Sequence, residues 1–104
     1  MNIYKYDICQ LSNYTDYMFE NWNYAKEHGF DLFDYKKVYS GEEEARDERD
    51  LLDYLFEKFN INHPEDFRGH SVSVSDLILI YNENIASVYY CDSFGWKRIG
   101  TIIL

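Results

Sequence analysis

Alternating apolar and polar positions mark the first strand that the sequence predicts. Asn2–Ile8 carries apolar side chains at every second position, with Tyr4 and Tyr6 on the same face as Ile8. This period of two is typical of a strand with one buried face. A second, shorter strand is predicted at Tyr35–Ser40, with Gly41 at its end.

The last third of the chain is predicted to consist of β-strands. Leu77–Tyr81 and Ile85–Cys91 are apolar runs on either side of the short polar segment Asn82–Asn84, which is the pattern of a β-hairpin. Because Leu77–Tyr81 is apolar on both faces, we expect it to be a central strand. Phe94-Gly95 is predicted to turn the chain into a final strand, Trp96–Leu104.

Helical periodicity occurs in two segments. The first begins with Ser12 or Asn13 as its N-cap and runs to about His28, with Gly29 just after its end. Its predicted buried stripe is Tyr14, Met18, Trp22 and Ala25. The second runs from Glu42 to about Phe59, and its predicted stripe is Ala45, Leu52, Leu55, Phe56 and Phe59. Together these elements predict a single α+β domain over residues 1–104, with an antiparallel sheet of about four or five strands covered by two helices.

Composition excludes several classes of protein. The 104 residues contain 19 acidic and 10 basic side chains, and a net charge of -9 excludes an ordinary basic nucleic-acid binder and argues against an anionic-membrane binder. An aromatic content of 19% excludes intrinsic disorder. No apolar run is long enough to span a membrane, and the first residues do not have the pattern of a signal peptide. Cys9 and Cys91 are interpreted as reduced thiols of a cytoplasmic protein.

The negative charge lies entirely in the first part of the chain. Residues 1–66 contain 16 acidic and 7 basic side chains, whereas residues 67–104 contain three of each. On helical wheels, one row of outward side chains falls on each predicted helix, and the candidate partner-binding residues are Asp16, Glu20, Glu27, Glu43, Asp47, Asp50, Tyr54 and Glu57. Such rows are suited to a mimic of nucleic acid, which competes for a cationic channel without binding nucleic acid itself.

Two other interpretations of the sequence remain open. Acidic helix faces also keep a small, aromatic-rich domain soluble without binding anything. The other is a small Cys–His or Ser–His hydrolase, and a metal site using His63, His70 and a carboxylate is a further possibility. The candidate residues for this chemistry are His63, His70, Ser71, Ser73, Ser75, Asp76, Cys91 and Asp92. Neither a nucleophile elbow nor a phosphate-binding glycine loop accompanies them. Ser75-Asp76 is therefore interpreted as hydrogen-bonding the backbone where the loop enters the central strand, and Asp92–Gly95 and His63–Asp66 are interpreted as turns. Ser71, Ser73 and Ser75 are expected to share one face of an extended segment.

Three motifs resemble the YodL-like family. They are Phe-Asn-x-x-His-Pro at Phe59–Pro64, Gly-His-Ser-x-Ser-Val-Ser-Asp at Gly69–Asp76 and Val-Tyr-x-Gly-Glu at Val38–Glu42, and the segment Tyr89–Lys97 is similar as well. The resemblance implies a protein of bacterial mobile elements or phages, with no known catalytic residues, no cofactor and an accessory, counter-defence context.

Charge, size and resemblance together predict a stoichiometric inhibitor. We expect the protein to bind a nucleic-acid-directed defence enzyme in the bacterial cytoplasm, as anti-CRISPR and anti-restriction proteins do, with a Cas9-type effector as the leading target. The alternative is a protein–protein interaction module that docks through its neutral last third, using Trp96 and the loop His63–His70. In neither case is a cofactor, a metal, a membrane or an enzymatic activity expected.

Overall fold

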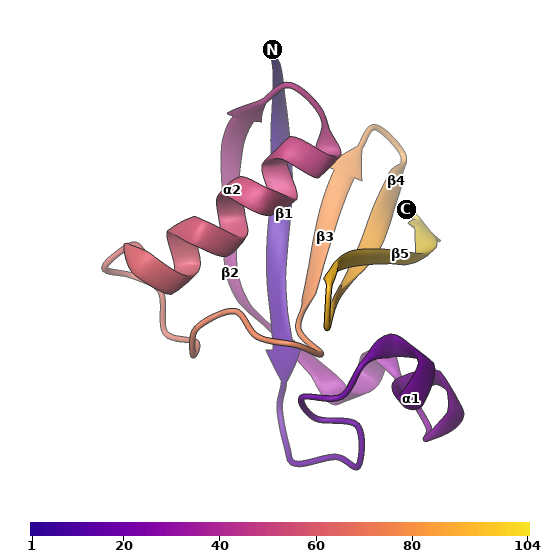
Figure 1. The fold of residues 1–104 in the computed structure, drawn as a ribbon. Coiled ribbons are helices and arrows are strands. Elements are labelled where there is room, and N and C mark those ends of the chain that lie inside the picture. Colours follow the sequence, from indigo (N-terminus) through magenta and orange to yellow (C-terminus); the bar gives the residue numbers. More distant parts are fainter.

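Five strands form one antiparallel sheet in the computed structural model, which describes residues 1–104. The strands are β1 (Asn2–Leu11), β2 (Tyr35–Ala45), β3 (Leu77–Asn82), β4 (Ile85–Asp92) and β5 (Gly95–Ile103). Their order in the sheet is β2-β1-β3-β4-β5, and every neighbouring pair is antiparallel. The sheet is twisted, and β5 bends along its course while it pairs with β4 from Asp92↔Gly95 to Ile85↔Ile103 (Figure 1).

The helices cover the sheet unequally. The longer one, α2 (Glu48–Ile61), crosses one face (Figure 1). The connection between β1 and β2 contains the short α1 (Trp22–Glu27) and a single turn of 3-10 helix at Leu32–Asp34, and it lies at the end of the sheet where β1 terminates. The predicted α+β class is therefore confirmed, but helices cover less of the sheet than the sequence suggested.

The predictions for the last third of the chain are confirmed. β3 and β4 form a hairpin with Glu83-Asn84 as its turn, and β3 is the middle strand of the sheet. Ser93-Phe94 connects β4 to β5, and Gly95 takes a positive φ of 85° directly after the turn. Glycine adopts this left-handed conformation without steric cost, which explains its position.

A hydrophobic core lies between α2 and the sheet. Leu51, Leu52, Leu55 and Phe59 of α2 are fully buried against side chains such as Tyr6 and Ile80 of the sheet. At about 1.5–3 kcal/mol for each large apolar side chain removed from water, these residues attach the helix firmly. A second, smaller core lies on the opposite face, where Tyr17 and Ala25 pack with Leu77 and Tyr90.

The first predicted helix is wrong over most of its length. Residues 12–20 form turns, and α1 begins only at Trp22, with Asn21 as its N-cap. Tertiary hydrogen bonds hold the turns: the Phe19 N–H donates to Ser75 Oγ and the Tyr90 hydroxyl donates to the Glu20 carbonyl. These bonds outcompete a helix in a segment rich in Asn, Asp, Ser and Thr, which are weak helix formers. The predicted role of Gly29 is confirmed, because its φ of 85° follows the end of α1.

The start of the second predicted helix is also wrong. Glu42–Glu44 belong to β2, where they pair with Ile3–Lys5 of β1, and α2 begins at Glu48. Asp47 is the N-cap, because its carboxylate accepts from the Asp50 N–H at 2.8 Å. Three consecutive glutamates are favourable at a helix N-terminus because of their charge. Here, however, backbone pairing with β1 holds them in an extended strand.

The buried side chains of both segments also differ from the predicted stripes. Tyr14 is 83% exposed and Tyr17 is buried in its place, because residues 12–20 follow no helical period. Phe56 of α2 is 42% exposed, whereas Leu51 is buried.

None of the helices has both the length and the apolar sequence that a membrane span requires.

Candidate functional site

The outer side of α2 carries a row of acidic side chains around one tyrosine. Asp50, Asp53, Tyr54 and Glu57 recur at helical spacing and point away from the buried set of this helix. From Asp50 to Glu57 the row extends about 10 Å along the helix axis. We refer to these four residues as the α2 acidic face.

Most of the negative charge on the α2 acidic face has no cationic partner. Asp50 pairs with Arg46 at 3.5 Å, and hydrogen bonds from the Arg46 backbone and guanidinium lower the pKa of that carboxyl. Lys58 lies 5.8 Å from the centre of the Tyr54 ring but forms its ion pair with Glu43, at 3.0 Å. Asp53 and Glu57 are exposed and have no Lys or Arg within ion-pair distance. They therefore remain free to meet a cationic partner.

The structure separates the predicted residues of the second helix into two groups. Asp50, Tyr54 and Glu57 share the α2 acidic face, as expected. Glu43 and Asp47 do not belong to it, because Glu43 lies on β2 in an ion pair with Lys58 and Asp47 caps the helix. Both carboxylates are therefore engaged in holding α2 in place.

Sequence reasoning missed Asp53. The predicted wheel was centred on Leu52, which places Asp53 only about 100° from the buried direction. Centred on the whole buried set, Leu51, Leu52, Leu55 and Phe59, the wheel places Asp53 about 145° away from the core. The sequence therefore contained the information that Asp53 faces outward, but using it required including Leu51 among the predicted buried residues.

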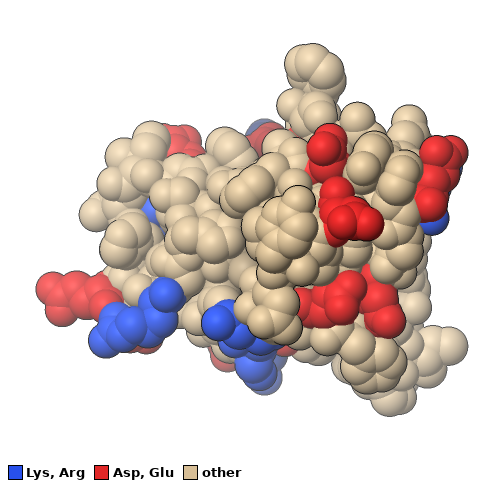
Figure 2. All heavy atoms as spheres, turned by 90° about the horizontal axis from the view of Figure 1, so that it is seen from below, with Lys and Arg blue, Asp and Glu red and all other residues tan.

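The three candidates of the predicted first helix do not form a row. Asp16, Glu20 and Glu27 are all exposed, but only Glu27 lies in α1, and the turns before Trp22 break the helical spacing. Figure 2 views the molecule from the end that contains this segment and shows separate groups of acidic side chains on its right half. These residues contribute to negative potential, but they offer no regular spacing.

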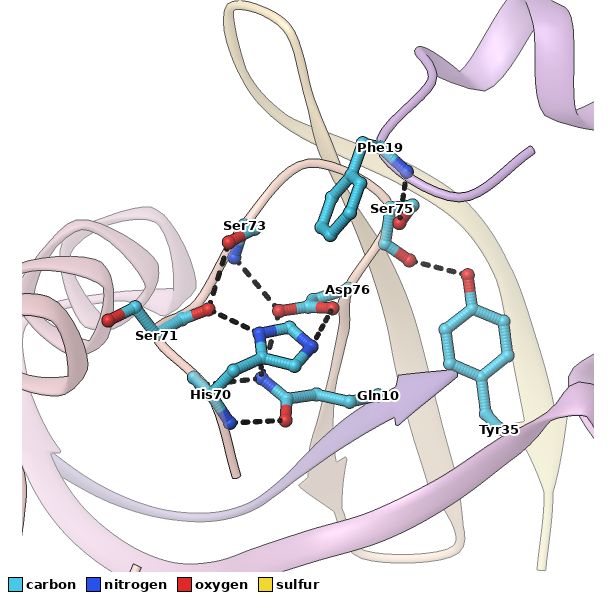
Figure 3. A network of polar contacts seen from close by, with 8 residues as sticks. All are labelled: Gln10, Phe19, Tyr35, His70, Ser71, Ser73, Ser75 and Asp76. Carbon is cyan, nitrogen blue, oxygen red and sulfur yellow. Dashed lines mark hydrogen bonds and ion pairs between the residues drawn. The ribbon is translucent and has the colours of Figure 1, made fainter. Parts of the chain in front are cut away.

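A network of polar contacts ties the end of β1 to the loop before β3 (Figure 3). The buried Gln10 amide nitrogen donates to the His70 carbonyl at 2.8 Å and to Asp76 Oδ2 at 3.0 Å, and its oxygen accepts from the His70 N–H at 3.1 Å. Asp76 Oδ2 also accepts from the Ser73 N–H at 2.8 Å, and Asp76 Oδ1 lies 3.9 Å from His70 Nε2. One side chain of β1 thus fixes the whole loop.

Ser75 anchors the same loop to three other segments. Its backbone takes a φ of 83°, and its N–H donates to the Cys91 carbonyl. Its carbonyl accepts from the Tyr35 hydroxyl, and its hydroxyl oxygen accepts from the Phe19 N–H at 3.0 Å. The prediction that Ser75-Asp76 hydrogen-bonds the backbone at the entrance to β3 is confirmed. The prediction that Ser71, Ser73 and Ser75 share one face is wrong, because the left-handed turn buries Ser75 while Ser71 remains exposed.

The arrangement of the cysteines and histidines does not assemble a nucleophile. Burial, together with Asp76 and Asp92, raises the pKa of the Cys91 thiol to about 12, so the thiol stays protonated at neutral pH. The His70 ring contacts Gln10, Ser71 and Asp76, and the His63 ring contacts Pro64 and Phe67. No group of three or more His, Cys, Asp or Glu side chains converges in a way that would hold a metal ion. Asp92 acts in turn formation, accepting from the N–H groups of Ser93 and Trp22.

The parent protein is expected to lose stability as the pH rises from about 4 to about 6, and Asp76→Asn is expected to abolish this pH dependence. Burial raises the pKa of Asp76 from 3.8 to about 6, while the Ser73 N–H, His70 and Gln10 oppose the shift. The folded state holds the proton of the Asp76 carboxyl more tightly than the unfolded state does. The contribution of protonated Asp76 to the free energy of unfolding is therefore fully present below about pH 4 and is lost as the pH rises through about 6. At about 1.4 kcal/mol for each pKa unit, the loss is on the order of 3 kcal/mol.

Urea denaturation of both proteins across this pH range measures the difference. Asparagine keeps an acceptor for Gln10 and Ser73, so the variant is expected to fold and to show a flatter pH dependence. Asp16→Asn, at an exposed carboxylate, is the matched control and is expected to follow the parent protein. Parallel curves for the parent and Asp76→Asn would contradict the argument.

A hollow of about 400 Å³ lies beside the α2 acidic face. It is lined by Asp53 and Phe56 of α2 and by residues around the β4–β5 turn, including Asp92 and Trp96. The prediction that Trp96 is an exposed docking residue is wrong, because it is only 8% exposed, whereas Phe94, at the tip of that turn, is 99% exposed. An exposed aromatic next to a partly apolar hollow is typical of a protein-binding surface.

Comparison with known proteins identifies a family but no characterised relative. The family model described as YodL-like domain matches residues 5–101. Neither the curated proteins nor the solved structures contain a match to the chain. The matched residues include all five strands in part or in full and both helices.

Proposed function

The chain belongs to the YodL-like domain family, and from this premise we propose that it is a small inhibitory domain that binds a nucleic-acid-directed enzyme stoichiometrically. Its α2 acidic face occupies a cationic surface of that enzyme which otherwise holds DNA or RNA. The domain itself binds a protein, carries out no catalysis and needs no cofactor.

The uncompensated charge of the α2 acidic face is the observation that carries this proposal. Twelve of the 19 carboxylates in the chain are exposed, and none of the twelve pairs with Lys or Arg. A solvated acidic surface needs only net charge, whereas this row adds fixed helical spacing and a half-exposed Tyr54 at its centre. Tyrosine is enriched among the residues that dominate binding energy at interfaces.

The rigidity of α2 supports a role in competition with nucleic acid. Its buried side chains hold the helix against the sheet, so the carboxylates of Asp53 and Glu57 are displayed on a fixed element. Preorganised charges lose little entropy when they meet a complementary cationic channel, and they accelerate the encounter. Nucleic acid binding by the domain itself is disfavoured by the net charge of -9.

The proposal extends to the setting in which such a protein acts. The resemblance to proteins of mobile elements and phages favours a counter-defence role of the anti-CRISPR type, in the cytoplasm of a bacterial host. A Cas9-type effector is the leading target because its guide and target strands lie in a positively charged channel.

The double variant Asp53→Lys/Glu57→Lys is expected to weaken binding to a Cas9-type effector by roughly 100-fold, because it removes two attractive charges and adds two repulsive ones. Both side chains are exposed and unpaired, so the fold should be unaffected. The measurement is inhibition of target cleavage by the purified effector, with the inhibitor added before or after guide RNA.

The double variant Asp16→Lys/Glu27→Lys is the matched control, since it makes the same change in net charge outside the α2 acidic face. It is expected to retain at least half of the inhibition. Equal loss in both variants would show that net charge alone matters. If the parent protein neither forms a complex with the effector nor inhibits cleavage, the choice of a Cas9-type target is refuted.

A second candidate function is an interaction module without inhibitory activity, and the 99% exposed Phe94 beside the hollow favours it. In that case Phe94→Ser abolishes partner capture while Asp53→Lys/Glu57→Lys does not. Salt separates the two functions as well. Binding through the α2 acidic face weakens steeply between 50 and 500 mM salt, on the order of tenfold or more, whereas apolar docking barely changes.

A further inference from the structure

A basic hollow of about 360 Å³ lies at the C-terminal end of β1, away from the α2 acidic face. Its lining includes Lys36 and Lys37 of β2 and Arg68 and His70 of the loop before β3. Lys36 is paired with Gln10 and Lys37 with Cys9, so the two lysines leave the strand on opposite faces, and Lys36 shares the face of Gln10. None of the lining residues is acidic. In a chain with a net charge of -9, the gathering of three of its ten Lys and Arg side chains around one hollow is unexpected.

The cations of this hollow are not used to neutralise carboxylates. Lys36, Lys37 and Arg68 are exposed and form no ion pair, and Arg68 donates only to the backbone carbonyl of Glu65, at 2.6 Å. His70 has one carboxylate nearby, Asp76 at 3.9 Å. Figure 2 shows basic side chains along the lower edge of this end of the molecule, with acidic groups on either side of them.

The two sides of the hollow are held at a fixed separation. Gly69 packs so closely on β1 that a Cβ atom there would clash with Gln10 Oε1 and lie 2.9 Å from the Phe67 ring. The hydrogen bonds of Gln10 then fix the His70 backbone on both its N–H and its carbonyl (Figure 3). On the other side, the register shift between Ile8 and Cys9 places an extra residue, Val38, next to Lys37. Bulges of this kind redirect the neighbouring side chains.

We propose that this hollow binds the phosphate group of a small phosphorylated molecule. The guanidinium of Arg68 provides a planar fork for two phosphate oxygens, and the ammonium group of Lys36, on the same face of the sheet as Gln10, provides a point charge. The volume accommodates a phosphate together with a substituent of about the size of a sugar. A long nucleic acid is disfavoured, because beyond the hollow it meets the negative potential of the rest of the molecule.

The test uses amide chemical shifts of the full chain titrated with adenosine 5′-monophosphate, inorganic phosphate, adenosine and a 20-nucleotide single strand. Adenosine 5′-monophosphate is expected to shift the amides of residues 36–38 and 68–70, and adenosine is not. Stronger binding of the monophosphate than of inorganic phosphate identifies an ester as the ligand, whereas equal binding identifies free phosphate. Tighter binding of the single strand at the same amides would overturn the restriction to small molecules.

Lys36→Gln/Arg68→Gln is expected to weaken binding of adenosine 5′-monophosphate at least tenfold. Lys26→Gln/Lys97→Gln, which makes the same charge change at exposed positions outside the hollow, is expected to change it less than twofold. All four side chains are exposed, so both variants should melt as the parent does. Absence of saturable shifts up to 10 mM phosphate ligand, or equal weakening in the two variants, would refute the site.

Discussion

Phe59→Ala is expected to lower the free energy of unfolding by about 3–5 kcal/mol, the range for a large aromatic removed from a packed core. Phe59 is fully buried, and its ring centre lies 4.9 Å from that of Phe67 and 5.1 Å from that of Tyr39. Its loss leaves a cavity between α2, β2 and the loop after the helix. Urea denaturation measures the change.

Phe56→Ala is the matched control for Phe59→Ala, because it removes the same atoms from the same helix. Phe56 is 42% exposed, with one aromatic contact to Trp96 at 6.4 Å between ring centres. Its expected cost is about 1 kcal/mol, since much of the ring already contacts water. Similar losses in the two variants would contradict the placement of Phe59 at the centre of this core.

Gln10→Leu is expected to cost about 2–4 kcal/mol, although it replaces a polar residue with an apolar one of similar size in a buried position. Gln10 is 2% exposed, and its loss leaves the N–H and carbonyl of His70 without their partner and removes one of the two hydrogen bonds that Asp76 Oδ2 accepts. Unpaired polar groups away from water account for the cost. The measurements are urea denaturation and hydrogen exchange of the His70 amide, which is expected to accelerate.

A double-mutant cycle isolates the contact between Gln10 and Asp76. In the background of Asp76→Leu, the carboxylate is absent, and Gln10→Leu is expected to cost at least 1 kcal/mol less than in the parent protein. Additive effects of the two substitutions would show that Gln10 stabilises the fold without this contact.

The strands of the last third were predictable because their structure depends on local pattern. Leu77–Tyr81 is apolar on both faces, and two turn segments flank Ile85–Cys91 at hairpin distance. Pairing between neighbouring segments of the chain requires little long-range information. The residues of these strands were therefore found within one or two positions.

The acidic site was predictable only in part. Helical periodicity identified Asp50, Tyr54 and Glu57, because α2 forms and packs its predicted apolar face against the sheet. Glu43 was placed wrongly, because a glutamate in a strand and one in a first helical turn look alike without the partner strand. The basic hollow was not predicted, since Lys36 and Arg68 lie 32 positions apart in the sequence and meet only in the folded protein.

The sequence by itself determined the α+β class, the order of the strands along the chain, the family and an acidic character confined to residues 1–66. These properties follow from composition and from periods of two or 3.6 residues, which are local. Only the tertiary structure decided that Asn13–Glu20 turn instead of forming a helix, and which carboxylates remain free. Both outcomes depend on hydrogen bonds and ion pairs with distant residues, and no local pattern encodes them.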